Sequence, residues 1–282
     1  MRIGLCLCGE IRTLEHCYHT IEEAFPESKV DIFATIWDRD VEKFNDLNVI
    51  EPKTLQVIQQ DHPIVTRLHD FEKQILSSTF EVYKGKVIDT WKPLPIYMLP
   101  RVELMARNSF NLIADRKTEY DYIVRSRYDH RYLRDVTELF ESHKILVTED
   151  IGGSAPWDTI MDYRCVYDGF AASSPMLMEL YYKFTDWLPN YYNDPNINNH
   201  LLKAESTLGY YLNGFMQLPM KYTNNILGMQ ISEDDFYLRG KEPKDVTIKT
   251  KRAVTLKQYK DTIKSNHPDV YEKYNVEEML CA

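Results

Sequence analysis

Two arginines and an aspartate stand at alternate positions in the segment Tyr120–Arg131, which reads YDYIVRSRYDHR. The tyrosine, isoleucine and valine content predicts a strand, and strand alternation places Arg125, Arg127 and Asp129 on one face. Paired guanidinium groups bind phosphate, and a carboxylate at a strand end can hold a divalent metal ion. We therefore predict an anion site here, with Asp129 as the candidate ligand of Mn²⁺ or Mg²⁺. The adjacent His130 is either a second site residue or an ordinary exposed histidine.

Two later carboxylates occupy positions that favour apolar side chains. Asp168 interrupts the apolar strand CVYDGFAAS, and Gly169 beside it permits close approach of another group. Glu205 falls on the apolar side of a predicted helix. Each could orient an acceptor or serve as general base, because burial shifts the pKa of a carboxyl group. The alternatives are a bulge geometry for Asp168 and a favourable position in the first helical turn for Glu205.

Loops after the first two predicted strands add further polar groups. Gly9 and Arg12 follow the first strand, where helix-start amides and a guanidinium could bind phosphate together. Asp38, Arg39 and Asp40 follow the second strand and form a DxD sequence, a short motif that sugar-nucleotide enzymes use to hold a metal ion. In an α/β fold a carboxylate at this place meets a ribose or base more readily than a metal. Asp38 is therefore a candidate nucleotide contact.

The order of predicted elements brings these side chains to one edge of a sheet. The chain opens with a β-α-β unit, and the carboxyl ends of its parallel strands form the expected ligand edge. Its parts are strand 2–8, helix 14–25 and strand 30–37. Later predicted elements are strand 54–60, helix 97–117, strand 120–131, strand 165–173, a helix starting at Ser174-Pro175 and a helix at about 200–212. Residues 61–95 receive no assignment.

Composition limits the function classes. The 282 residues are 44% hydrophobic, enough for a sizeable core, and the net charge is -9. No general attraction to nucleic acid or anionic lipid follows from such a charge, so an anion site has to come from a local cluster. No stretch approaches the roughly 20 apolar residues of a membrane helix, and we expect a cytoplasmic protein with no transmembrane segment. The five cysteines match no disulfide or zinc pattern and are predicted to be buried thiols.

Several blocks of the chain resemble, in their order, a group of glycosyltransferases found in bacteria and large DNA viruses. The blocks are IGLCLCGEIRTLEHCYHTI, VDIFATIWD, YDYIVRSRYDHRYL, YDGFAASSPMLMELY and HLLKAESTLGYYL. In that group a GQIR-like loop follows the first strand, an RxRxD-like motif lies mid-chain, and an Asp-containing strand and a Glu-containing helix come later. The resemblance covers residues 1 to about 240 in scattered blocks.

The resemblance implies a GT-A-like fold, in which a Rossmann-like half binds the nucleotide sugar and the later half receives the acceptor. It implies that Gly9 and Arg12 lie near the nucleotide and that Asp129 stands at the position of the DxD metal motif. The motif supplies one carboxylate here, so Arg125 or Arg127 could take over part of the charge neutralisation. Motifs of dinucleotide oxidoreductases, P-loop enzymes, zincins and α/β-hydrolases do not occur at these sites.

We thus predict an α/β protein with one GT-A-like domain at residues 1–240 and a helical C-terminal extension at 241–282. The expected activity is transfer of a sugar from a nucleotide diphosphate sugar to a carbohydrate or other hydroxyl acceptor, in glycan biosynthesis. Arg12, Arg125, Arg127 and a metal ion at Asp129 would stabilise the diphosphate leaving group. The alternatives are a non-catalytic module that binds nucleotides or sugars, and a metal-dependent phosphoesterase or nucleotidyltransferase. We expect no nucleic acid partner.

Overall fold

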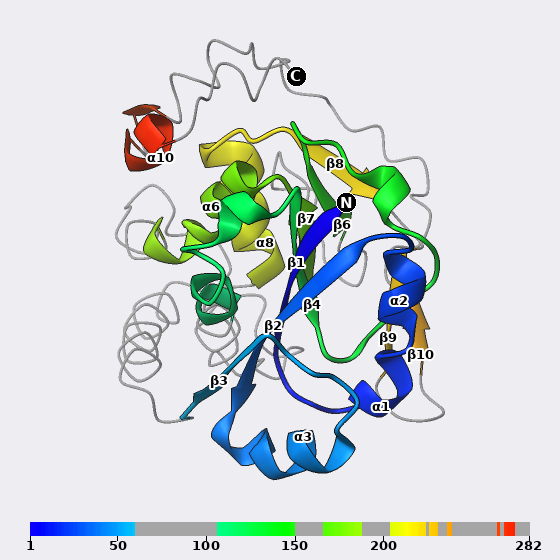
Figure 1. Cartoon of the computed structure of the whole chain (residues 1–282). Coiled ribbons are helices and arrows are strands. Elements are labelled where there is room, and N and C mark those ends of the chain that lie inside the picture. Colours follow the sequence, from blue (N-terminus) through cyan, green and yellow to red (C-terminus); the bar gives the residue numbers. More distant parts are fainter. Residues whose placement is uncertain are drawn as a thin grey trace, which may run out of the picture.

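A seven-stranded sheet forms the centre of the structure, a computed structural model that describes residues 1–59, 106–149, 166–187, 204–223, 226–230, 236–238, 264–265 and 268–273 (Figure 1). The strand order is β3-β2-β1-β4-β7-β6-β8. The strands are β1 (Arg2–Cys8), β2 (Lys29–Trp37), β3 (Thr54–Ile58), β4 (Tyr122–Arg127), β6 (Ile145–Glu149), β7 (Val166–Ser173) and β8 (Met220–Thr223). Neighbouring strands are parallel, except that β7 runs against both β4 and β6. The predicted α/β class with a mostly parallel sheet is confirmed.

The strand order reverses beside β1. The chain places β2 and β3 on one side of β1 and then returns to its other side with β4. Cys8, the last residue of β1, pairs with Thr35 of β2 and with Arg127 of β4. The carboxyl ends of β1 and β4 therefore lie next to each other at a topological switch point, which is where open α/β sheets bind their ligands.

Helices cover both faces of the sheet because the side chains of its strands alternate between two apolar layers. Leu5 and Leu7 of β1 face the layer that contains α1 (Leu14–Cys17), α2 (Thr20–Ala24) and α3 (Val41–Leu47). Cys6 and Cys8 face the other layer, which contains α6 (Pro175–Tyr182) and α8 (Ala204–Gly209). Figure 1 shows α6 and α8 on one side of the sheet and α1 and α2 on the other. Within the described residues, Cys6, Cys8 and Cys17 are buried free thiols, as predicted.

The predicted strand 120–131 is divided between two sheets. It comprises β4, a turn at Tyr128 and Asp129, and β5 (His130–Tyr132). β5 joins a second, antiparallel sheet with β9 (Leu227–Gln230) and β10 (Phe236–Leu238). The buried Tyr128 hydroxyl donates to the Thr35 carbonyl of β2 at 3.1 Å and fixes the turn on the main sheet. Asp129 therefore lies in a turn and not in a strand.

The predicted helix 14–25 is wrong in its continuity, because Tyr18 and His19 separate α1 from α2. The Thr20 hydroxyl donates to the Cys17 carbonyl at 2.7 Å and accepts the Tyr132 amide at 3.0 Å. A hydroxyl that bonds the backbone in this way competes with helical hydrogen bonding. The break thus ties this segment to β5, and α1 is too short to supply the helix-start anion site expected beside Arg12.

Later predicted elements are found in part. α6 begins at Pro175 as predicted, and the Ser174 carbonyl accepts the Met178 amide at 3.0 Å, but the Ser174 hydroxyl makes no capping bond. Only residues 106–111 of the predicted helix 97–117 are described as α-helix. Of the extension 241–282, α10 (Pro268–Lys273) contacts α6, where Lys183 Nζ lies 2.7 Å from Asp269 Oδ2. Among the residues described, no helix is long and apolar enough to cross a membrane.

Candidate functional site

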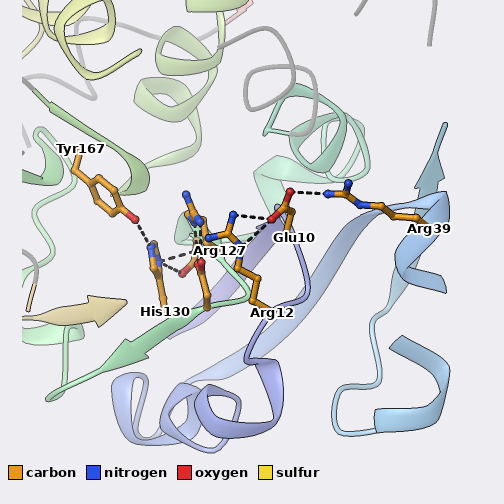
Figure 2. A network of polar contacts seen from close by, with 8 residues as sticks. Glu10, Arg12, Arg39, Arg127, His130 and Tyr167 are labelled. Atoms are coloured by element: carbon orange, nitrogen blue, oxygen red, sulfur yellow. Dashed lines mark hydrogen bonds and ion pairs between the residues drawn. The ribbon is translucent and has the colours of Figure 1, made fainter. Parts of the chain in front are cut away.

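Three arginines from separate parts of the chain gather at the carboxyl ends of β1, β2 and β4 (Figure 2). Arg12 belongs to the loop after β1, and Arg39 lies in the 3-10 turn Asp38–Asp40 that follows β2. Glu10 joins these two loops, because its carboxylate accepts Arg12 Nε at 2.7 Å and Arg39 Nη2 at 2.5 Å. All three side chains remain partly exposed. An anion that approaches this edge therefore meets guanidinium groups held by a single accessible carboxylate.

Arg127, the last residue of β4, forms a second and more deeply buried ion pair. Its Nε and Nη2 atoms donate to Asp129 Oδ1 and Oδ2 at 2.8 and 2.7 Å. The Asp129 side chain is 1% exposed, whereas that of Arg127 is 20% exposed. Burial by itself would raise the pKa of Asp129, but the attraction of Arg127 outweighs it and the pKa lies below its ordinary value. Arg12 acts on Asp129 in the same direction, so the two ion-paired groups are electrostatically connected.

A buried chain of hydrogen bonds fixes the turn that carries Asp129. The Arg127 amide donates to His130 Nδ1 at 3.3 Å, and the Ser126 hydroxyl lies 3.0 Å from the same nitrogen. Because Nδ1 accepts the amide proton, we assign the ring proton to Nε2, which donates to the Tyr167 hydroxyl at 2.8 Å. Tyr132 donates to Ser126 at 2.8 Å. His130 is thus buried, contrary to the exposed alternative, and it links the turn to β7.

The strand β7 is irregular where it approaches Arg127. Val147 of β6 pairs with Ala171, whereas Glu149 pairs with Val166, so four residues of β7 (167–170) lie opposite one residue of β6. This segment contains Asp168 and Gly169. A methyl group on Gly169 would lie 2.6 Å from the Tyr167 hydroxyl and 2.8 Å from Arg127 Cδ. The buried Asp168 also raises the pKa of Arg127, against burial, which lowers it. The bulge and the site therefore coincide.

Of the two aspartates in the DxD segment, Asp40 contacts the loop after β1, whereas Asp38 contacts its own turn. The exposed Asp38 accepts the amide of its neighbour Arg39 at 2.9 Å, which is a local turn contact. Asp40 points toward the loop after β1, where it accepts the Ile11 amide, and burial raises its pKa. Its Oδ2 atom is buried and has no hydrogen-bond partner. Within the described residues, Asp40 Oδ2 is therefore a buried acceptor without a hydrogen bond.

Arg125, a predicted site residue, differs from Arg127 in its surroundings. Arg125 lies on the same face of β4 but in the middle of the sheet, where Nη1 donates to the Tyr181 hydroxyl of α6 at 3.0 Å. Its guanidinium carbon stands 5.6 Å from the centre of that ring. Glu205 lies in α8, but its side chain is outside the described residues.

Gly9 has a φ of 121°, which disfavours any residue with a side chain. The nearest atom to a methyl group placed on it would be Arg127 Cγ at 3.9 Å. The backbone of the loop after β1 thus passes beside Arg127 and has space around it. Gly9, Arg12, Arg127, Asp129 and Asp168 all lie in this part of the sheet edge, as the sequence predicts.

The sequence interpretation missed the roles of Glu10, Arg39, Asp40 and Tyr167. Glu10 was part of the quoted GEIR loop, and Arg39 and Asp40 were part of the DxD, so their types and positions were visible. Their pairing was not, because Glu10 and Arg39 are 29 residues apart and meet only when β1 and β2 align.

The surroundings of Asp129 do not fit a metal centre. Both of its carboxylate oxygens accept hydrogen bonds from Arg127. In the part of the chain that the structure describes, no group of three or more His, Cys, Asp or Glu side chains could hold a metal ion. Mg²⁺ takes six oxygen ligands and Ca²⁺ six to eight, so one fully paired aspartate is a poor start for such a centre.

Comparison with known proteins adds no assignment. No family model matches the chain, and no curated protein matches it in sequence. Its function has to be inferred from the site.

Proposed function

We propose that this chain is a glycosyltransferase that moves a sugar from a nucleotide diphosphate sugar to a carbohydrate or other hydroxyl acceptor. The observation that carries the proposal is the convergence of Arg12, Arg39 and Arg127 at the switch point between β1 and β4. Three guanidinium groups suit a diphosphate, because each can donate two parallel hydrogen bonds to phosphate oxygens. The ordered resemblance of the sequence blocks to glycosyltransferases supports the same donor class.

Glu10 takes the place that a diphosphate oxygen would occupy. It is a partly exposed carboxylate between Arg12 and Arg39, and these guanidiniums hold its pKa below the ordinary value although burial acts to raise it. A diphosphate carries more negative charge and more acceptor oxygens than one carboxylate. It therefore competes for the same donors, and binding would release Glu10 to solvent.

Asp40 is the proposed contact of the ribose. A carboxylate that follows a strand beside the switch point accepts hydrogen bonds from ribose hydroxyls in nucleotide-binding α/β folds. Asp40 Oδ2 is buried without a partner, and a hydroxyl donor would satisfy it. Asp38 is left for a more peripheral contact, since its side chain is exposed and bonded to its own turn.

The electrostatic part of catalysis follows from the arginines. When the glycosidic bond to phosphate breaks, negative charge develops on the leaving diphosphate, and fixed guanidiniums stabilise it. Asp168, buried beside Arg127, is the proposed group that orients the acceptor hydroxyl or removes its proton, and Glu205 is the second candidate base. An inverting transfer needs such a base.

A thermal-shift screen tests the donor class. Nucleotide sugars of several bases and sugars are added to the intact chain, and a ligand of the native state raises the melting temperature. Positive donors then enter an assay for release of nucleoside diphosphate, with and without carbohydrate acceptors. The variant Arg2→Met, at the opposite end of the sheet, is the matched control for arginine substitutions in the site.

The outcomes separate the function classes. Binding with release of nucleoside diphosphate supports the transferase, and binding without turnover favours a non-catalytic binding module. Release of orthophosphate or pyrophosphate would favour a phosphoesterase or nucleotidyltransferase. Absence of binding by any nucleotide sugar would contradict the proposal.

A further inference from the structure

We propose that Arg127, held in place by Asp129, is the resident cation of the diphosphate site, so that nucleotide diphosphates bind without a divalent metal ion. Asp129 is then a positioning residue and not a metal ligand. This inference rests on the proposed function, because it concerns how the same site neutralises the diphosphate.

The Asp129 carboxylate is not arranged to bind a metal ion. A metal ligand needs an oxygen lone pair that points to an accessible position. The Asp129 side chain is 1% exposed, and each of its oxygens already accepts a hydrogen bond from Arg127. A metal ion could bind only after displacing Arg127. That displacement would leave the largely buried Arg127 guanidinium without its carboxylate partner, which is unfavourable.

Arg127 retains N–H donors that do not bond Asp129. A guanidinium has five N–H donors, and two of them bond Asp129, which leaves three. The side chain is 20% exposed at the carboxyl edge, beside the open loop at Gly9. The carboxylate therefore occupies one edge of the guanidinium, and the remaining donors are available for phosphate oxygens.

Several contacts hold the Arg127 side chain in one position. Asp129 holds the head group, His130 accepts the backbone amide, and Gly169 allows β7 to pack directly against the side-chain stem. A cation that is fixed before the ligand arrives stabilises developing charge without reorganisation. Arg12 and Arg39 stand at the neighbouring strand ends and supply the remaining positive charge.

The test measures nucleotide affinity with and without metal. UDP, GDP, CDP, ADP and dTDP are titrated into the intact protein by calorimetry, in EDTA and then in Mg²⁺ or Mn²⁺. We expect the same affinity in all buffers for the nucleotide that binds. In the variant Arg127→Lys, which keeps one charge but loses the bidentate geometry, the affinity is expected to fall about 10- to 100-fold in every buffer.

A second pair of variants separates binding from folding. Arg127→Met leaves Asp129 buried without its partner, so the double variant Arg127→Met/Asp129→Leu removes both charges together. We expect it to fold, as judged by circular dichroism, and to bind no nucleoside diphosphate. Asp129→Asn is expected to weaken binding less than Arg127→Lys and to remain insensitive to metal. Arg2→Met should bind as the wild type does.

Each contrary result has a distinct meaning. Nucleotide binding could disappear in EDTA, return with Mg²⁺ or Mn²⁺, and lose this metal response in Asp129→Asn. That result would overturn the metal-free site but would not contradict the proposed transferase. Wild-type affinity in the double variant would also overturn the role of Arg127. If no nucleoside diphosphate binds in any buffer, the proposed function fails, and this inference fails with it.

Discussion

The adjacent parallel strands β3, β2, β1 and β4 carry a charged cluster at each end, and the two clusters differ in the exposure of their ion pairs. At the amino end, Asp31 is the centre and accepts Lys53 Nζ at 2.9 Å, the Tyr120 hydroxyl at 2.9 Å and Arg2 Nη2 at 3.4 Å. Arg2 and Lys53 also lie over the Tyr120 ring, at 5.0 and 5.8 Å. These cations cover the buried Tyr120 ring, so the amino-end cluster shields an aromatic side chain of the core.

At the carboxyl end the cluster has two parts, an exposed bridge between arginines and a buried ion pair. Arg127 keeps three N–H donors after it pairs with Asp129, and the bridge from Glu10 to Arg12 and Arg39 is exposed. Both clusters contain cations and carboxylates in similar numbers, so a count of charges does not distinguish them. The direction of the strands does, because open α/β sheets bind ligands at the carboxyl ends of their strands.

The largest effect is expected from Arg127→Met. This variant leaves the buried Asp129 without its cation, and the free energy of unfolding should fall by about 3–5 kcal/mol. Arg2→Met at the amino end removes a partly exposed partner, so its loss of stability should be much smaller. Urea unfolding at neutral pH measures both. Equal losses would mean that the two clusters contribute to stability in the same way.

A smaller effect is expected from glycine substitutions. In Gly169→Ala the new methyl group meets Tyr167 and Arg127, so we expect a loss of about 1–3 kcal/mol in unfolding free energy together with weaker nucleotide binding. Gly4→Ala in β1 meets the Ile113 side chain near the amino end and should lower stability without changing nucleotide affinity. Calorimetric titration of both variants decides this. A loss of nucleotide affinity in Gly4→Ala would contradict the assignment of nucleotide binding to the carboxyl end alone.

The dependence of stability on pH distinguishes two carboxylates within the carboxyl-end cluster. The folded pKa of Asp129 lies below the ordinary value, so its ionised form stabilises the fold above about pH 4 and this contribution is lost as the pH falls through the folded pKa. Burial raises the folded pKa of Asp40, so its contribution is present below about pH 4 and is lost as the pH rises through the folded value.

Asparagine substitutions test these signs. At about pH 7, Asp129→Asn should be less stable than the wild type and Asp40→Asn more stable, and both differences should shrink below about pH 4. Urea unfolding across this range measures the differences. A stability difference for Asp129→Asn that stays constant with pH would contradict its ionised, paired state.

The smallest effect is expected from Glu10→Gln. The substitution removes the charge that competes with a diphosphate for Arg12 and Arg39, and exposed ion pairs contribute about 0.2–1 kcal/mol each. Loss of both pairs should therefore raise the nucleoside diphosphate affinity about 2- to 30-fold. Glu119→Gln, which removes a partner of Arg2 at the amino end, is the control and should leave the affinity unchanged. A fall in affinity in Glu10→Gln would show that Glu10 positions the arginines.

The sequence by itself determined the main elements of the sheet. Hydrophobic periodicity is a local property, so β1, β2, β3, β4 and β7 could be predicted within a few residues of their observed bounds. The parallel β1–β2 pair followed from the β-α-β opening, and with it the expectation that the loops 9–13 and 38–40 lie at the carboxyl edge of the sheet. Breaks that depend on distant partners were missed, such as the Thr20 contact with Tyr132.

Only the tertiary structure decided what each charge does. Arg125 and Arg127 are the same residue type on the same face of one strand, but Arg125 meets Tyr181 of α6 and Arg127 meets Asp129 at the edge. Position along the sheet sets this difference, because α6 covers Arg125 in the middle of β4, whereas Arg127 at its carboxyl end remains 20% exposed among the described residues. The pairing of Asp129 with Arg127 likewise arises from the turn between two sheets, which alternation within a single strand does not contain.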